Sequence, residues 1–239
     1  MAKRAKSKTK AKPETVRPLR RLLRWVWRSA LLVVMLILAA VAFYAVFNPP
    51  VTPYMLAEAR RLDGIERQWV DMDDIAPAMA RSAVAAEDAN FCLHWGFDMT
   101  AIRAAIAGGG RRGASTISQQ VVKNAYLWQG RSWLRKALEA VITPAVEAVW
   151  SKRRILEVYL NVAEFDEGVF GVEAAAQRYF GVAARDLSDV QAARLAMVLP
   201  SPKRRSASNP TPAERKRAAS ILDGAATIRA DGRSACFES

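Results

Sequence analysis

Apolar residues recur every three or four positions through most of the chain beyond residue 70, and that spacing predicts amphipathic helices. In the first such segment Ile75, Met79 and Ala83 lie four apart, and Asp73 or Asp74 precedes them as an N-cap. The pattern predicts helices over 75–88, 98–108, 116–127, 133–150, 152–161, 171–181, 190–200 and 213–222. About eight helices with short connections, and no convincing alternation typical of strands, indicate an all-α domain.

Residues that favour helix N-caps stand at the start of most of these segments. They are Asp98 or Thr100, Ser115, Ser132, Ser151, Ser188 and Thr211. Ser188 with Gln191, and Thr211 with Glu214, have the spacing of a capping box. Pro144 lies inside the longest segment, so a kink or a division is expected there.

A second hydrophobic pattern is continuous instead of periodic. Eighteen residues from Ala30 to Phe47 contain no charge, and as a helix they would span roughly 27 Å, close to the hydrocarbon thickness of a bilayer. Trp25 and Trp27 stand at the entry of this run, where interfacial aromatic residues are favourable. A cleaved signal peptide is the alternative, but the run is longer than a typical signal-peptide core and no clear cleavage site interrupts it. An uncleaved signal-anchor is therefore expected.

The charge distribution gives this span an orientation. The net charge is +13, and residues 1–28 hold eleven Lys and Arg against Glu14 alone, so most of the charge precedes the span. A basic flank stays on the cytoplasmic side. We expect a cytoplasmic tail over 1–28, a transmembrane anchor over 29–47, a proline-rich linker over 48–69 and an extracytoplasmic domain over 70–239. Because the body of the chain is not strongly basic, a nucleic-acid partner is not expected.

The cysteines and the histidine add little chemistry by themselves. Cys92 and Cys236 are the two cysteines of the chain, and an oxidising compartment permits a bridge without requiring one. Two unpaired thiols are the default expectation. His94 has no cysteine cluster near it, which argues against a zinc site.

The stretch Gly108–Gly113 matches the pattern G-x-G-x-x-G of dinucleotide-binding loops. That pattern has its meaning after a buried strand, and here a helical segment precedes it. The sequence therefore predicts a glycine-rich loop between two helices, whose following helix can present its N-terminus to a phosphate.

Several polar residues share helix faces near this loop. Thr116, Gln120 and Lys123 fall on one face, Arg135 and Glu139 are four apart, and Glu87 with Asp88 ends a helix of small residues. Each group alone is what an ordinary solvated helix face shows.

Five stretches in order nevertheless resemble a known family. They are "EDANFCLHWGFD" (87–98), "GASTISQQVVKN" (113–124), "RKALE" (135–139), "KRRILEVYLN" (152–161) and "GVEAAAQRYFG" (171–181). This series resembles the five motifs of the bacterial peptidoglycan glycosyltransferases, glycosyltransferase family 51, and the resemblance covers about residues 70–205. The one S-x-x-K, at Ser7, lies in the basic tail without its partner motifs, so the chain resembles the monofunctional form without a transpeptidase.

The resemblance implies a lysozyme-like helical domain with a groove between two lobes, which joins lipid II units into glycan strands with inversion. It implies Glu87 as the base that takes a proton from the attacking sugar hydroxyl. Lys123 and Arg135 are implied to hold the diphosphate of the leaving group. Glu139 matches the second essential carboxylate, which could orient a cation, bind a divalent ion such as Mg²⁺ or Mn²⁺, or act as a weak acid.

The full set of residues expected to contact substrate is larger. It comprises Asp88, Ser115, Thr116, Gln120, Lys123, Asn124, Arg135 and Lys136. Arg111 and Arg112 fit either a phosphate contact or a solvated pair, whereas His94 and Gly96 are expected to shape the loop after Glu87. No covalent cofactor is expected.

The expected location is the inner membrane, with the catalytic domain in the periplasm. Expected partners are lipid II, the growing glycan, the membrane and other proteins of wall synthesis and division. Trp128 and Trp133 fit the membrane interface or ordinary packing equally well. Two rival functions stay open: a membrane-anchored lysozyme-like enzyme that cleaves peptidoglycan, and a non-catalytic scaffold for wall synthesis.

Overall fold

The computed structural model describes residues 16–109, 113–130 and 132–238 of the 239-residue chain. The chain divides into two compact units, Met1–Ala40 and Val41–Ser239. Arg111 and Arg112, for which a phosphate contact and a solvated pair were equally expected, lie outside the described residues.

Helix α1 (Val16–Val46) contains the uncharged run identified in the sequence. From Arg20 to Val46 it is long and apolar enough to cross a membrane, with a mean hydropathy of 2.7 in its most apolar stretch. Within the described ranges it is the one helix with these properties. An N-terminal membrane anchor is thus supported by length and composition.

The second unit contains the rest of the secondary structure. Its helices are α2 (Pro53–Leu62), α3 (Pro77–Glu87), α4 (Met99–Ala107), α5 (Ile117–Tyr126), α6 (Trp133–Val149), α7 (Lys152–Val162), α8 (Val172–Phe180), α9 (Asp189–Val198), α10 (Pro212–Ala230) and α11 (Ala235–Glu238). Three 3₁₀ turns are η1 (Met72–Asp74), η2 (Phe91–Leu93) and η3 (Ala184–Asp186). The predicted helical class is confirmed, and α2 lies inside the segment expected as a linker.

Most of the predicted caps are present. Asp98, Ser132 and Ser151 accept a hydrogen bond from the first turn of their helices, and Ser188 and Thr211 form complete capping boxes. These bonds satisfy amide groups that have no partner inside the helix.

Three local predictions are corrected. Asp73 and Asp74 lie in η1, and α3 starts at Pro77 after Ala76, because proline at the first helical position fixes φ and needs no acceptor. Thr116, not Ser115, caps α5. Of the kink or division expected at Pro144, the division is absent, since α6 runs unbroken across it, and the kink stays a prediction.

The structure contains a small three-stranded sheet that the sequence did not predict. Strand β3 (Val169–Phe170) lies between β1 (Glu66–Arg67), which is parallel to it, and β2 (Glu164–Asp166), which is antiparallel. Strands of two or three residues are too short to show an alternating pattern. Gly168 permits the tight β2–β3 connection with a φ of +74°.

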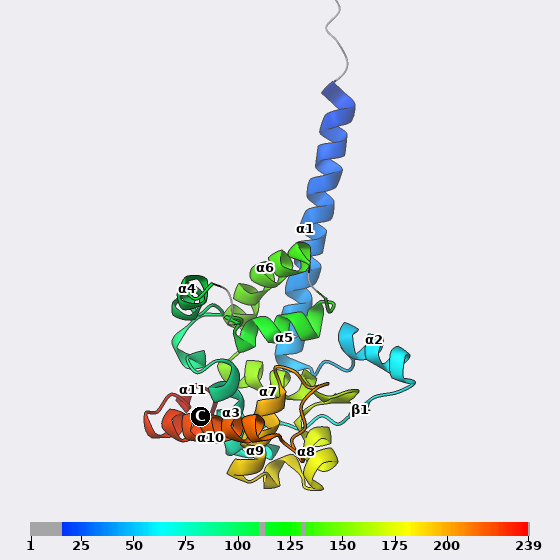
Figure 1. Cartoon of the computed structure of the whole chain (residues 1–239). Coiled ribbons are helices and arrows are strands. Elements are labelled where there is room, and N and C mark those ends of the chain that lie inside the picture. The colour runs from blue at the N-terminus through cyan, green and yellow to red at the C-terminus, as the bar shows by residue number, and fades with distance from the viewer. Residues whose placement is uncertain (1–15, 110–112, 131, 239) are drawn as a thin grey trace, which may run out of the picture. The chain divides into compact units, whose positions relative to one another are not determined.

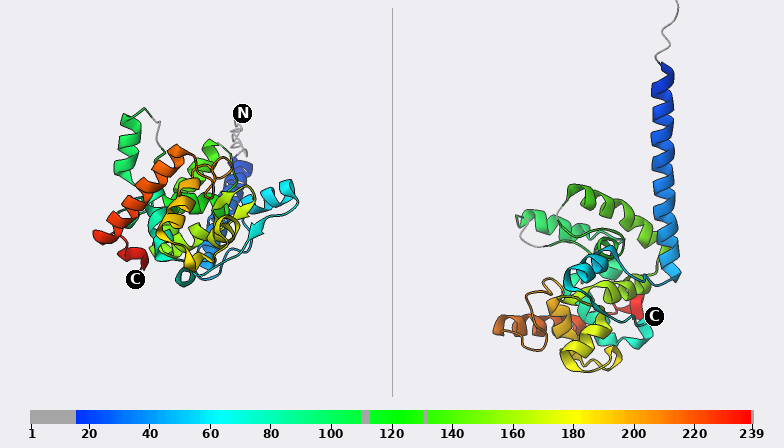
Figure 2. Two further views of the ribbon diagram at one scale, coloured as in Figure 1. Left: turned by 60° about the horizontal axis from the view of Figure 1, so that its bottom comes forward. Right: turned by 90° about the vertical axis from the view of Figure 1, so that its right-hand side faces the viewer.

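The helices of the second unit form two groups. Helices α3, α9 and α10 pack on one another, while α5 packs on both α6 and α7. Figures 1 and 2 show α4 and α6 on one side of α5, and α3, α8, α9 and α10 on the other. Tyr159, Phe91 and Ile117 are among the largest fully buried side chains of the core.

The cysteines correct a further expectation. Cys92 in η2 and Cys236 in α11 form a disulfide bond with a Cα–Cα distance of 5.8 Å, so the unpaired-thiol default was wrong. Their separation of 144 residues gave no signal in the sequence, because the pairing of two cysteines depends on the tertiary fold.

The C-terminal end of α1 belongs to the second unit and is held by two side chains. Trp150 Nε1 donates to the Val41 carbonyl at 2.8 Å. Arg154 Nη2 donates to the carbonyls of Tyr44 and Phe47, both at 3.0 Å. The bonds from Arg154 satisfy carbonyl groups at the helix end that have no partner inside the helix, and the bond from Trp150 adds a second donor to a carbonyl of the preceding turn.

Candidate active site

Glu87 is the last residue of α3 and accepts a hydrogen bond from the side chain of α5 residue Gln120. The distance from Gln120 Nε2 to Glu87 Oε2 is 2.8 Å, and Gln120 Oε1 accepts from the buried Tyr159 hydroxyl at 3.5 Å. Burial raises the pKa of Glu87, against the opposing effects of Gln120, Arg217 and Lys123. A desolvated carboxylate with one neutral donor is suited to take up a proton.

Asp88 joins the loop after α3 to the start of α5. Its Oδ2 accepts from the Ile117 amide at 2.9 Å, and its Oδ1 lies 2.8 Å from His94 Nε2. A carboxylate at a helix N-terminus satisfies a free amide and is favoured by the helix dipole. His94 thus shapes the loop after Glu87, as the sequence analysis expected.

Thr116 and Gly96 form a second connection between the start of α5 and the loop after α3. The Thr116 hydroxyl donates to the Gly96 carbonyl at 2.7 Å, and its oxygen also accepts from the Gln119 amide. Gly96 has a φ of +84°, and a Cβ there would lie 2.7 Å from Thr143 Cγ2. The loop can therefore approach α6 this closely only with glycine at position 96.

The carboxylate of Glu139 is buried between two cations on α6. Arg135 Nη1 lies 3.0 Å from Glu139 Oε2, and Lys136 Nζ bonds to the other oxygen, Oε1. Only 3% of the Glu139 side chain is exposed. The two pairs hold Arg135 and Lys136 on one side of the helix.

Lys123 on α5 stands apart from these pairs. Within the described part of the chain it has no hydrogen-bond or ion-pair partner, although both Glu139 and Glu87 act on it electrostatically. Burial is the largest effect on Lys123 and lowers its pKa. A desolvated cation without a protein partner is suited to an anionic ligand.

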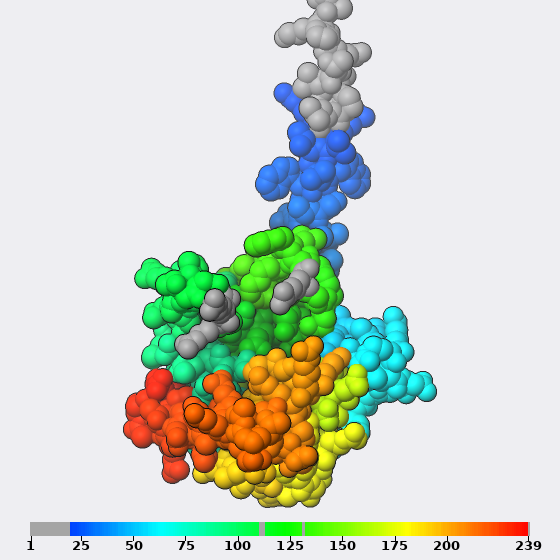
Figure 3. Space-filling model, viewed as in Figure 1, coloured from blue at the N-terminus to red at the C-terminus, as the bar shows by residue number. Residues whose placement is uncertain are grey.

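Two cavities meet over Gln120 and Lys123. A cavity of about 260 Å³ is lined by Ser115, Gln119, Gln120, Lys123, Arg135, Lys136 and Glu139. Another of about 320 Å³ is lined by Gln120 and Lys123 together with twelve further residues, including Asn124, Tyr159, Glu164 and Lys203. Figure 3 shows this face hollowed between the green residues of α4–α6 and the orange residues after α9. We call the two cavities together the groove.

The structure brings most of the predicted residues into this groove. Ser115, Gln120, Lys123, Arg135, Lys136 and Glu139 line the smaller cavity, and Asn124 lines the larger. Asp88 and Thr116 are buried, and their polar atoms contact the protein itself. Their assignment to substrate contact stays a prediction.

The groove also contains residues that the sequence analysis did not single out. Tyr54 donates to Glu164, and Lys203 Nζ lies 3.7 Å from the Glu164 carboxylate. Burial raises the pKa of Glu164. The basic run "KRR" at 203–205 was a visible signal for this wall, whereas Tyr54 and Glu164 come from segments with no distinctive pattern.

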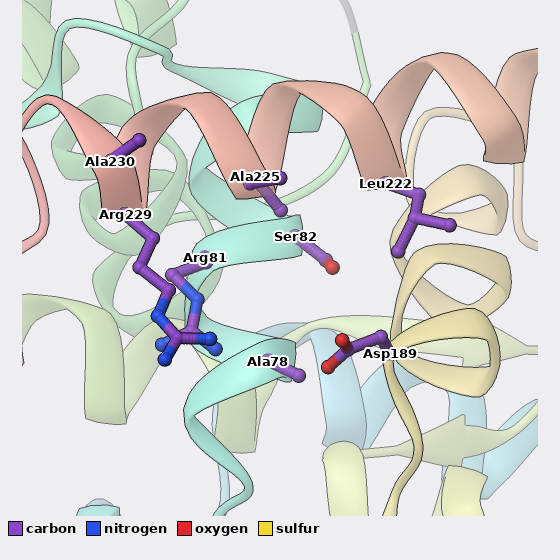
Figure 4. Close-up of a pocket in the computed structure, with 9 residues that line it drawn as sticks. Ala78, Arg81, Ser82, Asp189, Leu222, Ala225, Arg229 and Ala230 are labelled. Carbon is purple, nitrogen blue, oxygen red and sulfur yellow. The ribbon is translucent and has the colours of Figure 1, made fainter.

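A separate cavity of about 380 Å³ lies between α3, α9 and α10. Figure 4 shows the guanidinium groups of Arg81 and Arg229 at one end of this view and Asp189 at the other. It shares no lining residue with the groove.

Comparisons with known proteins match nearly the whole of this chain. A sequence model of the family described as "Transglycosylase" matches residues 55–226, which contain every described residue of the groove except Tyr54. Biosynthetic peptidoglycan transglycosylase of Jannaschia sp. is 61% identical over 238 residues, covering 99% of both chains. The proteins of the same name from Rhodospirillum centenum and Caulobacter vibrioides are 49% and 45% identical, over 85% and 90% of this chain and 90% and 98% of their own. With the groove described above, these matches show that the chain belongs to the transglycosylase family.

Proposed function

We propose that this chain polymerises the glycan strands of peptidoglycan. The growing lipid-linked glycan is transferred to the sugar 4-hydroxyl of lipid II, with inversion, and undecaprenyl diphosphate is released. One observation carries this proposal: a desolvated carboxylate, Glu87, is linked through Gln120 to a cavity that contains Lys123, a cation without a partner among the described residues.

Glu87 supplies the base. A sugar hydroxyl is a poor nucleophile until its proton is removed in the transition state. The hydrogen bond from Gln120 holds one Glu87 oxygen, which leaves the other for the acceptor hydroxyl. Tyr159 fixes Gln120 in turn, since its hydroxyl donates to the amide oxygen.

The smaller cavity suits the diphosphate of the donor. Lys123, Arg135 and Lys136 line it, and Glu139 neutralises part of their charge. The diphosphate leaves as a stable anion, so positive charge is more useful to it than a strong general acid. The positive charge of Lys123 can be neutralised by the phosphate itself.

The contacts of Glu139 support one of its three expected roles. Both carboxylate oxygens already contact cations, Arg135 and Lys136, which leaves poor ligands for a divalent metal. The residues present therefore do not fit a metal site built on Glu139. We assign Glu139 the role of orienting Arg135 and Lys136 toward the diphosphate.

Two connected cavities suit a reaction with two large substrates. If the diphosphate of the growing chain occupies the smaller cavity, the larger one is available for the acceptor. Its lining of Tyr54, Glu164 and Lys203 offers an aromatic ring and polar groups for sugar recognition.

The substrate and the apolar helix favour a location at the inner membrane, with the second unit in the periplasm. The basic residues before the span favour a cytoplasmic N-terminus. Trp133 is 91% exposed, which suits a membrane interface better than packing within the domain. Other proteins of wall synthesis and division are proposed as partners.

The features of the same groove favour polymerisation over the two rival functions. An enzyme that cleaves finished glycan needs no cavity with three cations for a diphosphate, and a scaffold needs no desolvated carboxylate. The relatives cited above are named as biosynthetic transglycosylases, which also favours polymerisation.

The test is polymerisation of fluorescently labelled lipid II by the full chain in detergent, with products separated as a ladder of glycan lengths. Glu87→Gln should lower the rate by about 10²–10⁴-fold, the usual contribution of a general base. Glu66→Gln is the matched control, because Glu66 is an exposed carboxylate outside the groove. A ladder that Glu87→Gln still produces at the parental rate would refute the assignment, and cleavage of finished glycan in its place would favour the rival enzyme.

A further inference from the structure

The C-terminal segment Asp231–Glu238 lies beyond the residues that match the family and packs on the loop after Glu87. Cys236 in this segment is bonded to Cys92 in η2. Arg233 Nη1 donates to the Ala89 carbonyl at 2.9 Å. Both connections reach the stretch between Glu87 and His94, although the segment comes more than a hundred residues later in the chain.

The segment is itself fixed to the core. Phe237 is fully buried, and its ring centroid lies 6.3 Å from that of the buried Phe91. Arg153 of α7 donates to the Phe237 carbonyl at 3.1 Å, and Arg81 of α3 pairs with Glu238 at 2.6 Å. Arg81 also lines the cavity shown in Figure 4. Segment 231–238 therefore connects the loop to both α3 and α7.

The loop held in this way reaches the base through a short series of contacts. Asp88 opens the loop and accepts from the Ile117 amide, the first residue of α5. The same helix carries Gln120, which donates to Glu87. A displacement of the loop would thus move the N-terminus of α5 and the hydrogen bond that orients the base.

We propose that segment 231–238, fastened by the Cys92–Cys236 bond, is a brace that positions Glu87 for proton transfer. This inference rests on the proposed function of the groove. The bridge is a positioning element and touches no substrate. Its contribution is expected in the chemical step, because small misplacements of a catalytic group reduce rates strongly while ligand contacts elsewhere persist.

The Cys92–Cys236 disulfide bond can be reduced and formed again in one preparation. Dithiothreitol reduces the bridge by thiol–disulfide exchange, which yields two cysteine thiols and the cyclic disulfide of the reagent. Oxidised glutathione reverses this, since two successive exchanges restore the bridge and release two molecules of reduced glutathione. Both cysteines are half-buried, which leaves the bond accessible.

The experiment uses the full chain in detergent, oxidised, reduced and reoxidised. Reduction is expected to lower kcat roughly tenfold or more with little change in KM for lipid II, and reoxidation to restore kcat. Hydrogen exchange of residues 88–94 should accelerate while α9 stays protected. The acidic limb of the pH profile should move to lower pH, because hydration removes the burial that raises the pKa of Glu87.

Two variants serve as controls. The double variant Cys92→Ser/Cys236→Ser should match the reduced chain and respond no further to dithiothreitol. Lys216→Ala, an exposed change on α10, should behave as the parent. The positioning role would be overturned by an unchanged kcat or by unchanged hydrogen exchange in residues 88–94. It would also be overturned if hydrogen exchange accelerated uniformly across the domain. If the oxidised chain makes no glycan, the proposed function fails, and the exchange measurement alone decides whether the brace exists.

Discussion

Glu87 and Lys123 are two buried charged residues whose environments differ from those of their counterparts on a protein surface. Burial raises the pKa of the carboxyl and lowers that of the ammonium. Both residues were expected on helices near the glycine loop, but nothing in the sequence indicated their desolvation, which depends on how distant elements pack around them. Their identities were therefore predictable, and their altered acidity was not.

The pH dependence of polymerisation follows from the raised pKa of Glu87 and the lowered pKa of Lys123. Polymerisation should rise with pH through the pKa of Glu87, above the ordinary glutamate range, because the base acts in its ionised form. It should fall through the pKa of Lys123, below the ordinary lysine range, as the cation loses its proton. Lys123→Arg should remove the alkaline fall, since arginine stays charged. A profile of kcat/KM against pH for parent and variant checks this, and an unchanged alkaline limb would contradict it.

Glu87 should also affect stability. A raised pKa in the folded chain means that folding favours the protonated form, so ionisation at neutral pH weakens the fold. Glu87→Gln is expected to raise Tm at pH 7–8, with the gain disappearing as the pH falls below the ordinary glutamate range. Thermal unfolding at several pH values measures this. A gain that persists unchanged at acid pH would assign the effect to packing.

Lys123→Met should separate activity from folding. Because Lys123 pairs with no described residue, its removal is expected to leave Tm unchanged or higher. The polymerisation rate should fall on the order of 10²-fold, as charge stabilisation of the leaving group is lost. Lys216→Met, on the exposed face of α10, is the matched control and should keep full activity. A large fall in Tm would show that Lys123 has a structural role.

At the scale of elements, helix caps were predictable because they depend on a few adjacent residues. Ser188 and Thr211 cap the helices that their sequences predicted. Asp73 and Asp74 have the right chemistry but lie within the 3₁₀ turn η1, and Pro77 sets the start of α3. Such a choice between neighbouring caps is made by the tertiary contacts of the loop, which the local sequence does not contain.

The capping boxes of α5 and α9 allow a comparison, because α5 carries groove residues and α9 does not. Thr116→Ala should cost more than the ~1 kcal/mol typical of a lost cap, because Thr116 also donates to Gly96. Ser188→Ala, in the exposed box of α9, should cost about 1 kcal/mol. Only Thr116→Ala should lower the polymerisation rate, since α5 carries Gln120 and Lys123. Chemical denaturation and the glycan ladder provide the two readouts, and equal activity of the variants would contradict the argument.

Gly96 is expected to be the more sensitive of two glycines with positive φ. Gly181→Ala should cost about 1–2 kcal/mol for the left-handed conformation alone, because nothing lies near its added Cβ. Gly96→Ala adds a contact of 2.7 Å with Thr143 and should cost more than that. The free energy of unfolding in denaturant compares them. Equal losses would mean that the loop can move away from α6.

At the scale of the whole molecule, the helical class, the anchor and most helix positions followed from periodicity and hydropathy, and the family confirms the lysozyme-like fold that the motifs implied. The groove runs from the cavity between α5 and α6 to the wall formed by residues 199–204 after α9. The short sheet, the Cys92–Cys236 bond and the wall containing Glu164 were not predicted. The pairing of β1 with β3 and of Cys92 with Cys236 joins residues that are distant in sequence, and no local pattern marks such pairings. In the wall that contains Glu164, the basic run at 203–205 was the visible signal.

The attachment at the end of α1 has a practical consequence for inhibitor discovery. A fragment that starts after Asn48 would leave Trp150 and Arg154 without their acceptors on residues 41–48, and its Tm should be below that of a fragment that starts at Val41. Arg154 lies on α7, the helix that presents Tyr159 to Gln120. Compounds screened against the shorter fragment would therefore be selected on a loosened groove, and those that recognise the ordered one would be missed.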